Sequence, residues 1–238
     1  MRTIPRISVL TAIKNSEAFL RTCLECLAKQ TLIQETEIIV VGYKTNNREK
    51  EILADFQKKG APVIYISANS PGLYYAWNLG IKNSRGMYIT NLNADDRLKN
   101  DALEIMAKAL DDNSRIALVY GDNYITTKPN ETFDHNSSKG QISNRPVYSH
   151  RELLIKCICG PFPMWRRELH KEVGYFDEHY RVAGDYEFWL RIAEQYPMRH
   201  IQKVIGLYYK NPKGLACTSR TLLKKECFEI KRKYLYSK

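Results

Sequence analysis

The amino-acid sequence predicts an α/β fold in which a mostly parallel sheet is flanked by helices. Through the first 120 residues, short segments rich in Ile and Val alternate with longer amphipathic segments. Apolar segments that do not alternate with polar residues are typical of strands covered on both faces. Strands alternating with helices are the pattern of right-handed βαβ units. The length of 238 residues suits one large α/β domain or two small ones, with a sizeable core.

The predicted elements follow one another at short intervals from the N-terminus. Strands are expected at residues 7–11, 37–41, 63–66, 88–92 and 116–120. Helices are expected between them, at about residues 17–29, 48–58, 73–83 and 100–110. In the first helix the apolar residues recur at intervals of three and four, which is the spacing of one buried helical face: Leu20, Cys23, Leu24 and Leu27.

The sequence becomes less regular after residue 121. Residues 122–149 are polar, with many Asn, Ser, Thr and Lys, and we interpret them as a long excursion or mobile loop. Order is expected to resume at 157–165, followed by a short helix to about residue 172. A longer helix at about 185–195 and a strand at 198–209 complete the second half.

Neither an interdomain linker nor an internal repeat is visible in the sequence. We therefore expect one domain over residues 1–215, made of a nucleotide-binding half at 1–121 and an irregular half at 122–215. A basic C-terminal helix is expected at 216–238.

Composition and cysteine spacing favour a cytoplasmic protein. No apolar run approaches the roughly 18 residues that a membrane span needs, and the N-terminus lacks the long apolar segment of a signal peptide. Cys23 and Cys26 lie on the apolar face of the first helix, and Cys157 and Cys159 lack the matching spacing of a zinc site. We expect reduced core thiols.

A formal net charge of +11 predicts an anionic partner. Residues 220–238 hold seven Lys or Arg against two Glu, and apolar residues recur through them at helical spacing. Such a helix suits peripheral contact with an anionic membrane, at its inner face for a cytoplasmic protein, or an ordinary C-terminal helix with a solvated basic face. Nucleic acid is a third interpretation, but no recognition motif supports it, and we expect none to bind.

Two adjacent carboxylates, Asp95 and Asp96, follow the predicted strand at 88–92. Ligands collect at the carboxyl ends of strands in α/β sheets. Mutual repulsion of two acids there is relieved by a cation, and oxygen ligands beside a substrate phosphate commonly hold Mg²⁺ or Mn²⁺. A solvated turn that caps the following helix is the structural alternative.

Several motifs, in this order and spacing, resemble an inverting glycosyltransferase of family 2 with the GT-A fold. They are Ile-Ser-Val-Leu-Thr-Ala-Ile-Lys-Asn at 7–15, Glu-Ile-Ile-Val-Val at 37–41, Gly-Leu-Tyr-Tyr-Ala-Trp-Asn-Leu-Gly-Ile at 72–81, Asn-Ala-Asp-Asp at 93–96, and the segment 174–191 with Gly-Asp-Tyr-Glu-Phe-Trp-Leu-Arg at its end. The resemblance covers about residues 6–215, and it lies in the order of the motifs more than in any one of them.

The resemblance implies a nucleotide-diphosphate sugar donor and a divalent cation, Mn²⁺ or Mg²⁺, held by Asp95. Asp185 is then the general base that takes the proton of the acceptor hydroxyl, although a helix N-cap is its structural alternative. Trp165 is the candidate for lining the acceptor site. The donor-binding residues implied are Thr11, Ala12, Asn15, Tyr43, Asn78, Asn93, Asp96, Lys210 and Lys213.

Three departures from the family pattern bear on activity. Residues 42–46, Gly-Tyr-Lys-Thr-Asn, lack the acid that usually recognises the base, so Tyr43 or Asn46 would serve or the donor differs. Asn93 replaces the first acid of the metal motif. Residues 210–214, Lys-Asn-Pro-Lys-Gly, offer two lysines in place of Arg and His, and lysines neutralise phosphate without bidentate geometry.

The function expected is inverting, metal-dependent sugar transfer to a glycan or lipid-linked acceptor in surface polysaccharide synthesis. Its transition state should be oxocarbenium-like. The alternative is a catalytically inactive scaffold of the same fold, which the departures at residues 42–46 and 93 favour. A dinucleotide oxidoreductase is disfavoured because no G-x-G-x-x-G follows the first strand.

Overall fold

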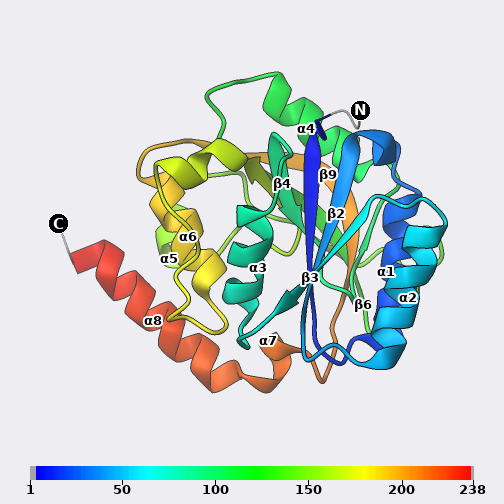
Figure 1. Cartoon of the computed structure of the whole chain (residues 1–238). Helices are drawn as coiled ribbons and strands as arrows, with labels where there is room; N and C mark the ends of the chain where they lie inside the picture. The colour runs from blue at the N-terminus through cyan, green and yellow to red at the C-terminus, as the bar shows by residue number, and fades with distance from the viewer. Residues whose placement is uncertain (1–3, 237–238) are drawn as a thin grey trace.

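The computed structural model describes residues 4–236. Residues 1–3, 237 and 238, which the expected domain and C-terminal helix include, lie outside the described residues. Strands and helices alternate through the first half of the chain (Figure 1). The strands are β1 (Ile7–Ile13), β2 (Thr36–Tyr43), β3 (Val63–Ala68), β4 (Tyr88–Asn91), β5 (Arg97–Leu98), β6 (Leu118–Thr126), β7 (Ile142–Ser143), β8 (Pro163–Arg166) and β9 (Met198–Tyr209).

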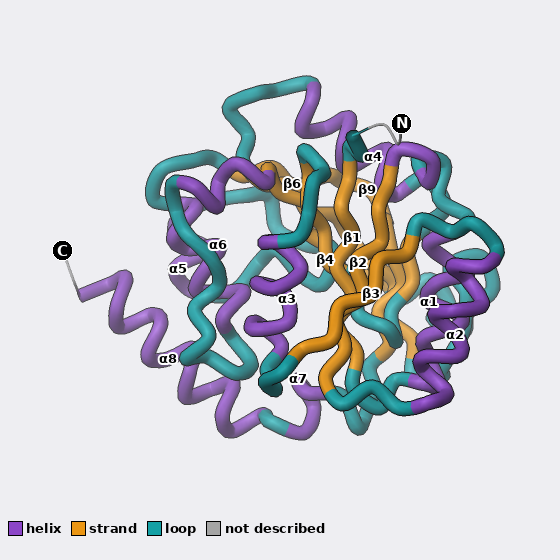
Figure 2. The backbone as a smooth tube through the Cα atoms, in the orientation of Figure 1, coloured by secondary structure: helices purple, strands orange, loops and turns teal. Residues whose placement is uncertain are grey.

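Helices cover both faces of the sheet (Figure 2). The helices are α1 (Glu17–Ala28), α2 (Asn47–Lys58), α3 (Leu73–Lys82), α4 (Ala102–Asp111), α5 (His150–Ile155), α6 (Gly184–Ala193), α7 (Leu215–Thr218) and α8 (Arg220–Tyr236). Short 3₁₀ turns occur at Ile33–Glu35 and Arg167–Lys171.

Within the described residues, nine strands form one mixed sheet in the order β3-β2-β1-β4-β8-β6-β9-β5, with β7 paired to β6. The first four strands in this order are parallel to one another. β8 is antiparallel to both β4 and β6, and β5 is antiparallel to β9. The predicted α/β fold with a mostly parallel sheet is therefore confirmed.

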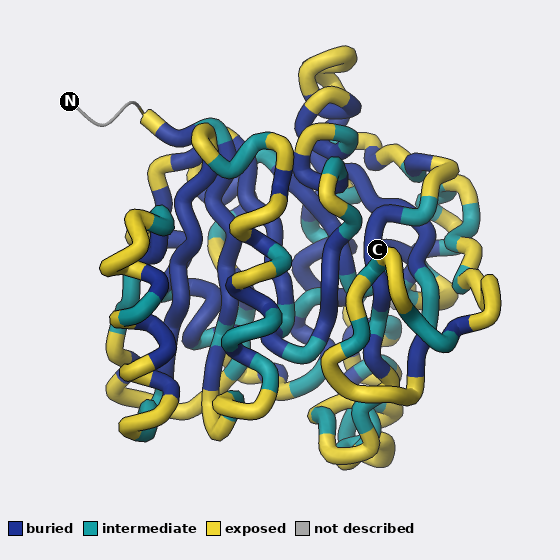
Figure 3. The backbone as a smooth tube through the Cα atoms, turned by 90° about the vertical axis from the view of Figure 1, so that its right-hand side faces the viewer, coloured by how far each residue is buried: buried dark blue, intermediate teal, exposed yellow. Residues whose placement is uncertain are grey.

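The core is divided between the two faces of the sheet, and the strands between them are buried (Figure 3). On one face α1, α2 and α4 pack against residues such as Val9 and Val40. On the other, α3, α5, α6 and α8 pack against residues such as Leu10 and Ile39. Neighbouring residues of one strand thus enter opposite clusters, which explains why the strand sequences are apolar without alternation.

The interpretation of residues 122–149 as a loop is wrong at its start and for a short strand within it, and order resumes at residue 150, before the expected residue 157. β6 continues to Thr126 and crosses the expected boundary between the two halves, β7 adds a short strand, and the first residue of α5 is His150, with Ser149 as its N-cap. At the start of this segment the polar Asp122 misled the prediction, because it is buried and paired. Its Oδ1 lies 2.9 Å from His200 Nε2, across the β6–β9 pair.

The carboxyl ends of β1, β2 and β4 lie side by side, at the bottom of Figure 1 beside α7. The loops that leave β1 and β2 each contain a non-glycine residue with positive φ, Asn15 at 54° and Lys44 at 51°. Such backbone is sparsely populated and concentrates at functional sites. The adjacent loop after β4 carries Asp95 and Asp96.

The C-terminal helix α8 lies along α5 and α6 (Figure 1). Ile230 is fully buried, and Leu223, Cys227 and Tyr234 pack against the same cluster. Among the described residues, no helix is both long and apolar enough to cross a membrane. The cysteines of residues 4–236 form no disulfide; Cys23 and Cys159 are buried.

Candidate active site

A buried guanidinium shapes the acidic turn that follows β4. Arg97 Nη1 donates hydrogen bonds to the carbonyl oxygens of Ala94 (2.9 Å) and Asp96 (2.5 Å). Its Nη2 donates to Asn130 Oδ1 at 3.0 Å and also bonds the Thr22 hydroxyl. Charge-assisted bonds to carbonyl groups are strong when they are shielded from water. Arg97 therefore fixes the path of the main chain through the two acids.

Asp96 is inside the protein, with 1% of its surface exposed. Its Oδ1 accepts a hydrogen bond from Tyr209 N at 2.9 Å, and its Oδ2 accepts one from Asn93 Nδ2 at 3.1 Å. Burial, with a contribution from the charge of Asp95, raises the pKa of Asp96 to about 8. We expected Asp96 to border the sugar; instead, its Oδ1 ties the acidic turn to the end of β9, and its Oδ2 bonds Asn93 within the turn.

Asp95 is half-buried and faces outward from the same turn. Its Oδ2 accepts a hydrogen bond from Asn211 Nδ2 at 2.8 Å, and its other oxygen makes no hydrogen bond among the described residues. Nowhere in residues 4–236 do three His, Cys, Asp or Glu side chains gather as a metal site. The donor set fits a hard cation such as Mg²⁺ or Mn²⁺, which is often held by one or two carboxylates together with substrate phosphates and water.

Asp185 is the second residue of α6 and lies beside the start of α3. Tyr74, the second residue of α3, donates from its hydroxyl to Asp185 Oδ1 at 3.1 Å. The main-chain N–H of Tyr186 donates to the same oxygen at 2.9 Å. Because α3 follows β3, this contact brings Asp185 to the carboxyl edge of the sheet, where the acidic turn lies.

The environment of Asp185 makes its carboxylate a stronger base than an exposed aspartate. Burial raises its pKa, and the two hydrogen bonds only partly oppose that rise. The side chain is an acceptor of hydrogen bonds from within α6 and not an N-cap, since the N-cap position of α6 is Ala183. A carboxylate with a raised pKa at a substrate-facing edge is suited to general base catalysis.

The loops after β1 and β2 are joined by Glu49, which is buried in α2. Glu49 Oε1 accepts from Ser16 N at 2.7 Å, and Oε2 accepts from Asn46 N at 2.9 Å. Asn46 in turn caps α2 and donates to Glu17 Oε2 at 3.0 Å. The Asn46 side chain is thus engaged at its oxygen by the capping box and at its nitrogen by Glu17.

Gly42 lies near the end of β2, in a closely folded part of the chain. A Cβ on Gly42 would lie 2.1 Å from Thr45 Oγ1, so the loop folds closely over this position. Tyr43 is half-buried, with the ammonium groups of Lys14 and Lys44 each 5.5 Å from its ring centroid. The loop therefore offers cations and an aromatic ring, together with the exposed Asn15 and the half-buried Ala12.

Three predicted site residues are placed in the interior instead. Trp165, with 0% exposure, donates from Nε1 to His170 Nε2 at 2.9 Å and packs against Trp189, so it cannot line an acceptor site in this structure. Both the nitrogen and the oxygen of the Asn78 side-chain amide form hydrogen bonds with the loop at residues 176–178. Thr11 is also buried. Aromatic and amide side chains of this kind stabilise the core, and sequence alone did not separate this role from ligand binding.

The two lysines expected at the diphosphate are exposed beyond the end of β9. Lys210 N donates to Thr126 O at 2.9 Å, which continues the β6–β9 pairing, and Lys213 N donates to Asn211 Oδ1 at 2.9 Å. Asn211 thus links this loop to Asp95. Both ammonium groups are carried by a segment anchored beside the acidic turn.

Arg145 is a cation that the sequence did not indicate, because it lies in the segment interpreted as a loop. Its main-chain N–H donates to Asp122 Oδ1 at 2.6 Å, and its Nη2 donates to Asn123 Oδ1 at 3.0 Å. Burial raises the pKa of Tyr208 and that of Cys157, and the charge of Arg145 opposes both rises. The charges of Asp96 and Asp95 add to the rise at Tyr208, and the charge of Asp185 adds to the rise at Cys157. Within the described chain Arg145 makes no ion pair, so its charge is available to an anionic group.

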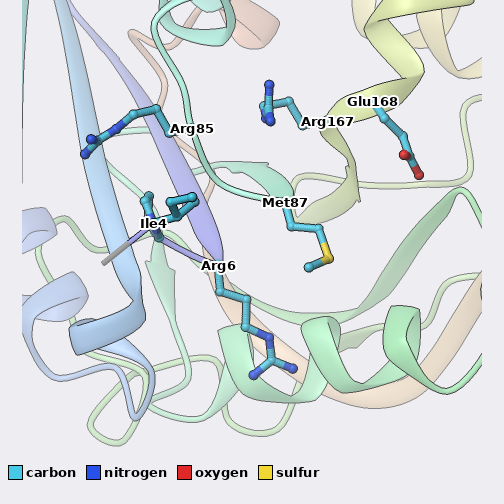
Figure 4. A pocket seen from close by; sticks show the side chains of 7 residues that line it. Ile4, Arg6, Arg85, Met87, Arg167 and Glu168 are labelled. Carbon is cyan, nitrogen blue, oxygen red and sulfur yellow. The ribbon is translucent and has the colours of Figure 1, made fainter. Parts of the chain in front are cut away.

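A hollow at the opposite edge of the sheet is distinct from this site (Figure 4). It is lined by Ile4, Pro5, Arg6, Arg85, Met87, Arg167 and Glu168. Its arginines are already paired: Arg6 with Asp111, and Arg85 with Glu37, while Arg167 Nε donates to a main-chain carbonyl at 2.7 Å. The hollow lies at the amino ends of β1 and β4, and we assign it no role in the reaction.

The mixed α/β fold and the acids at the carboxyl edge of its sheet define a glycosyltransferase of the GT-A class. The family profile described as Glycosyl transferase family 2 matches residues 8–174, and the chain belongs to that family. The predicted family and fold are therefore confirmed.

Relatives of known name agree with this assignment. The chain is 28% identical over 204 residues to a chondroitin synthase of Escherichia coli, covering 86% of this chain and 29% of the relative. It is 28% identical over 222 residues to the uncharacterized glycosyltransferase EpsJ of Bacillus subtilis, covering 89% of this chain and 63% of the relative. The chain thus spans less than two thirds of either relative.

Solved structures share the fold. TarS of S. aureus (residues 1–349), in complex with UDP-GlcNAc, superposes with a TM-score of 0.71 at 18% identity, covering 90% of this chain and 61% of that one. The mannosyltransferase PcManGT of Pyrobaculum calidifontis, in complex with GDP-Man and Mn²⁺, gives a TM-score of 0.74 at 15% identity, covering 99% and 66%.

Proposed function

We propose that the protein transfers a sugar from a nucleotide-diphosphate sugar to a glycan hydroxyl with inversion at the anomeric carbon, and that it requires Mn²⁺ or Mg²⁺. The observation that carries the proposal is the difference between its carboxylates at one edge of the sheet. Asp95 is open and has a free oxygen, Asp96 is buried, and Asp185 is a desolvated base. Carboxylates whose environments set their pKa values apart are suited to different roles.

The reaction needs a bond to break at the phosphate and another to form at the acceptor. As the bond between the anomeric carbon and the phosphate oxygen breaks, the electron pair stays on the nucleoside diphosphate. A cation bound at Asp95 would supply Lewis-acid stabilisation of that charge. The oxygen of the acceptor hydroxyl forms a bond to the anomeric carbon from the opposite face of the sugar, and Asp185 accepts the proton of that hydroxyl. Tyr74 donates to Asp185 Oδ1, which leaves Oδ2 for the proton.

Donor binding is supported by the cations and amides around the acidic turn. Lys210, Lys213 and Arg145 are the groups we assign to the diphosphate. Ala12 and Tyr43 lie near the ends of β1 and β2, Asn15 and Asn93 lie in loops at the same edge, and we assign all four to the nucleoside and the sugar. Solved structures with the same fold are complexes with UDP-GlcNAc and with GDP-Man, which supports the donor class without naming the base.

The acceptor we propose is a growing surface polysaccharide or its lipid-linked precursor. The named relatives, among them chondroitin synthase, support a glycan acceptor. The outer face of α8 supports reaction at the inner surface of a membrane. Phe228 is 65% exposed and Leu235 49% exposed, and both lie among Lys and Arg side chains. Exposed apolar residues flanked by cations suit an anionic lipid surface.

Replacing the base tests the proposal. Asp185→Asn should lower turnover by about 10²–10⁴-fold, the usual contribution of a general base, while the donor still binds. The rate is measured as release of UDP or GDP from a panel of nucleotide sugars with Mn²⁺, using Asp112→Asn on the exposed end of α4 as the control. Wild-type turnover in Asp185→Asn would remove this residue from the base role, and absence of turnover by the wild type would favour the inactive scaffold.

A further inference from the structure

One buried carboxylate of the C-terminal helix bonds the main chain just before α6. Glu226 of α8 has 5% of its surface exposed. Its Oε1 accepts from Arg181 N at 2.9 Å, and its Oε2 accepts from Val182 N at 2.9 Å and from Ala183 N at 2.8 Å. Three hydrogen bonds to one buried carboxylate are a strong, charge-assisted arrangement.

These three donors lie at the N-cap position of α6 and in the two residues before it. The first N–H groups of a helix and the segment before it have no acceptor within the helix. Ala183, at the N-cap position, has no side chain able to accept them, and α6 has no side-chain cap of its own in the described chain. Glu226, from a helix about 45 residues later in the sequence, therefore accepts the N–H at the N-cap position of α6 together with those of the two residues before it.

A second set of contacts holds α8 in the position this requires. Glu187 of α6 is buried, and its Oε1 accepts from Lys233 Nζ and from Tyr234 Oη, both at 2.9 Å. Between Glu226 and these residues, Ile230 is fully buried in the cluster beneath α6. The register of α8 along α6 is thus set at both ends, and Glu226 has little freedom to leave the segment at 181–183.

We propose that Glu226 is a positioning residue for Asp185, so that α8 is a working part of the active site and not only a basic tail. Asp185 is two residues beyond the last N–H that Glu226 binds, and a shift of the 181–183 segment moves it directly. This inference rests on the proposed function, in which Asp185 is the base.

The charge of Glu226 gives the proposal a second readout. The groups that face Asp185 are Tyr74 of α3, Glu226 and Cys227 of α8, and Cys157 and Cys159 of the segment after α5. Burial is the main cause of the raised pKa of Asp185, and the negative charge of Glu226 adds to it. Removal of that charge must lower the pKa of Asp185, since the ionised form is then less repelled.

Glu226→Gln and Glu226→Asp separate position from charge. Gln keeps the size but places an NH₂ group against a main-chain N–H, and it removes the charge. Asp keeps the charge but is one methylene too short to reach all three donors. The control is Glu229→Gln, which removes an exposed carboxylate of the same helix, 3.8 Å from Lys225.

The measurement is the pH profile of kcat/KM, from release of UDP or GDP with Mn²⁺ and the best donor of the panel. We expect kcat to fall about 10–100-fold in both Glu226 variants, with the donor KM little changed, because small displacements of a catalytic group cost about this much. The acid limb should move to lower pH, by up to about one unit, in Glu226→Gln only. Glu229→Gln should match the wild type.

Two outcomes overturn the inference and differ from failure of the proposed function. If Asp185→Asn is inactive but Glu226→Gln keeps the wild-type kcat and acid limb, Glu226 does not position the base. If both Glu226 variants lose donor-induced thermal stabilisation together with activity, the role of Glu226 is in general folding. If Asp185→Asn is active, the proposed function itself fails, whatever Glu226 does.

Discussion

Asp95 and Asp96 are neighbours in the sequence but differ in what surrounds them. Asp96 is bonded by Tyr209 N and Asn93 Nδ2 inside the protein, whereas Asp95 keeps one oxygen open beside Asn211. The first arrangement fixes the turn and the second leaves a ligand position. The difference in burial therefore gives Asp96 a structural role and leaves Asp95 for the ligand-binding role that we propose.

Asp96 should make the metal-free protein less stable as the pH rises. Its folded-state pKa, about 8, is above the ordinary value of 3.8, so the folded protein retains a proton that the unfolded chain has lost. Its contribution to stability is complete below about pH 4 and declines as the pH rises toward 8. Between pH 5 and pH 8 in EDTA, the free energy of unfolding of the wild type should fall by about 2–4 kcal/mol relative to Asp96→Asn. Parallel curves for the two proteins in urea denaturation would contradict this.

Tyr74 should lower the pKa of Asp185, since its hydroxyl donates to the ionised carboxylate. In Tyr74→Phe that donor is lost, so the pKa of Asp185 should rise and the acid limb of kcat/KM should move to higher pH, by up to about one unit. The direction is opposite to that expected for Glu226→Gln. Tyr75→Phe, which removes a hydroxyl on the exposed side of the same helix, is the control. An unmoved limb in Tyr74→Phe would show that this hydrogen bond does not act on the base.

At the scale of elements, the site depends on how closely α6 packs against α3. Gly184, the first residue of α6, allows this approach: a Cβ there would lie 2.8 Å from two ring atoms of Tyr74. The aromatic rings of Tyr74, Trp77 and Phe176 continue the same contact into the core. The position of Asp185 is thus set by packing from one side and by α8 from the other.

Gly184→Ala should therefore disturb both stability and catalysis. Overpacking of a close helix contact costs about 1–3 kcal/mol, and the displaced Tyr74 ring should carry its hydroxyl away from Asp185. Thermal unfolding and turnover are measured for Gly184→Ala with and without Tyr74→Ala. The glycine substitution should cost less in the Tyr74→Ala background, where the ring is absent. Equal costs in the two backgrounds would place the effect elsewhere than at the ring.

The elements of the first half were predictable because each obeys one local rule. Strands β1 to β3 are mostly apolar, and the apolar residues of α1 recur at helical spacing. The second half was less predictable because its burial comes from distant partners: Asp122 pairs with His200 across the sheet, and Trp165 pairs with His170. In the sequence, the polar residues there indicated a loop, and the tryptophan that proves to be buried indicated a ligand-binding residue.

The candidate site was predictable only where a motif preserved its local sequence. Asp95 and Asp185 lie in segments with a family pattern, and both are half-buried in the structure. Two of the groups to which we assign their orientation, Asn211 and Glu226, come from remote segments. Their contribution depends on tertiary contacts, which spacing in one sequence does not reveal.

Over the whole molecule, the net charge of +11 is concentrated partly on α8, whose inner face is packed and whose outer face is not. With Phe228 and Leu235 exposed on that face, the protein should float with vesicles that contain phosphatidylglycerol and less with neutral vesicles. Replacing both residues with Ser should weaken flotation several-fold, and Met87→Ser at the opposite edge of the sheet should not. Equal flotation of the Phe228 and Leu235 variant would exclude this face as the membrane contact.

The central claim is that the edge bearing Asp95 binds a nucleotide-diphosphate sugar together with a divalent cation. The most direct measurement is the thermal stability of the wild type and of Asp95→Ala with a panel of nucleotide sugars, each with and without Mn²⁺. A ligand that binds only the folded state raises its melting temperature. We predict a rise for at least one donor that needs Mn²⁺ in the wild type and is lost in Asp95→Ala. An equal rise in both proteins, or one independent of Mn²⁺, would contradict the account.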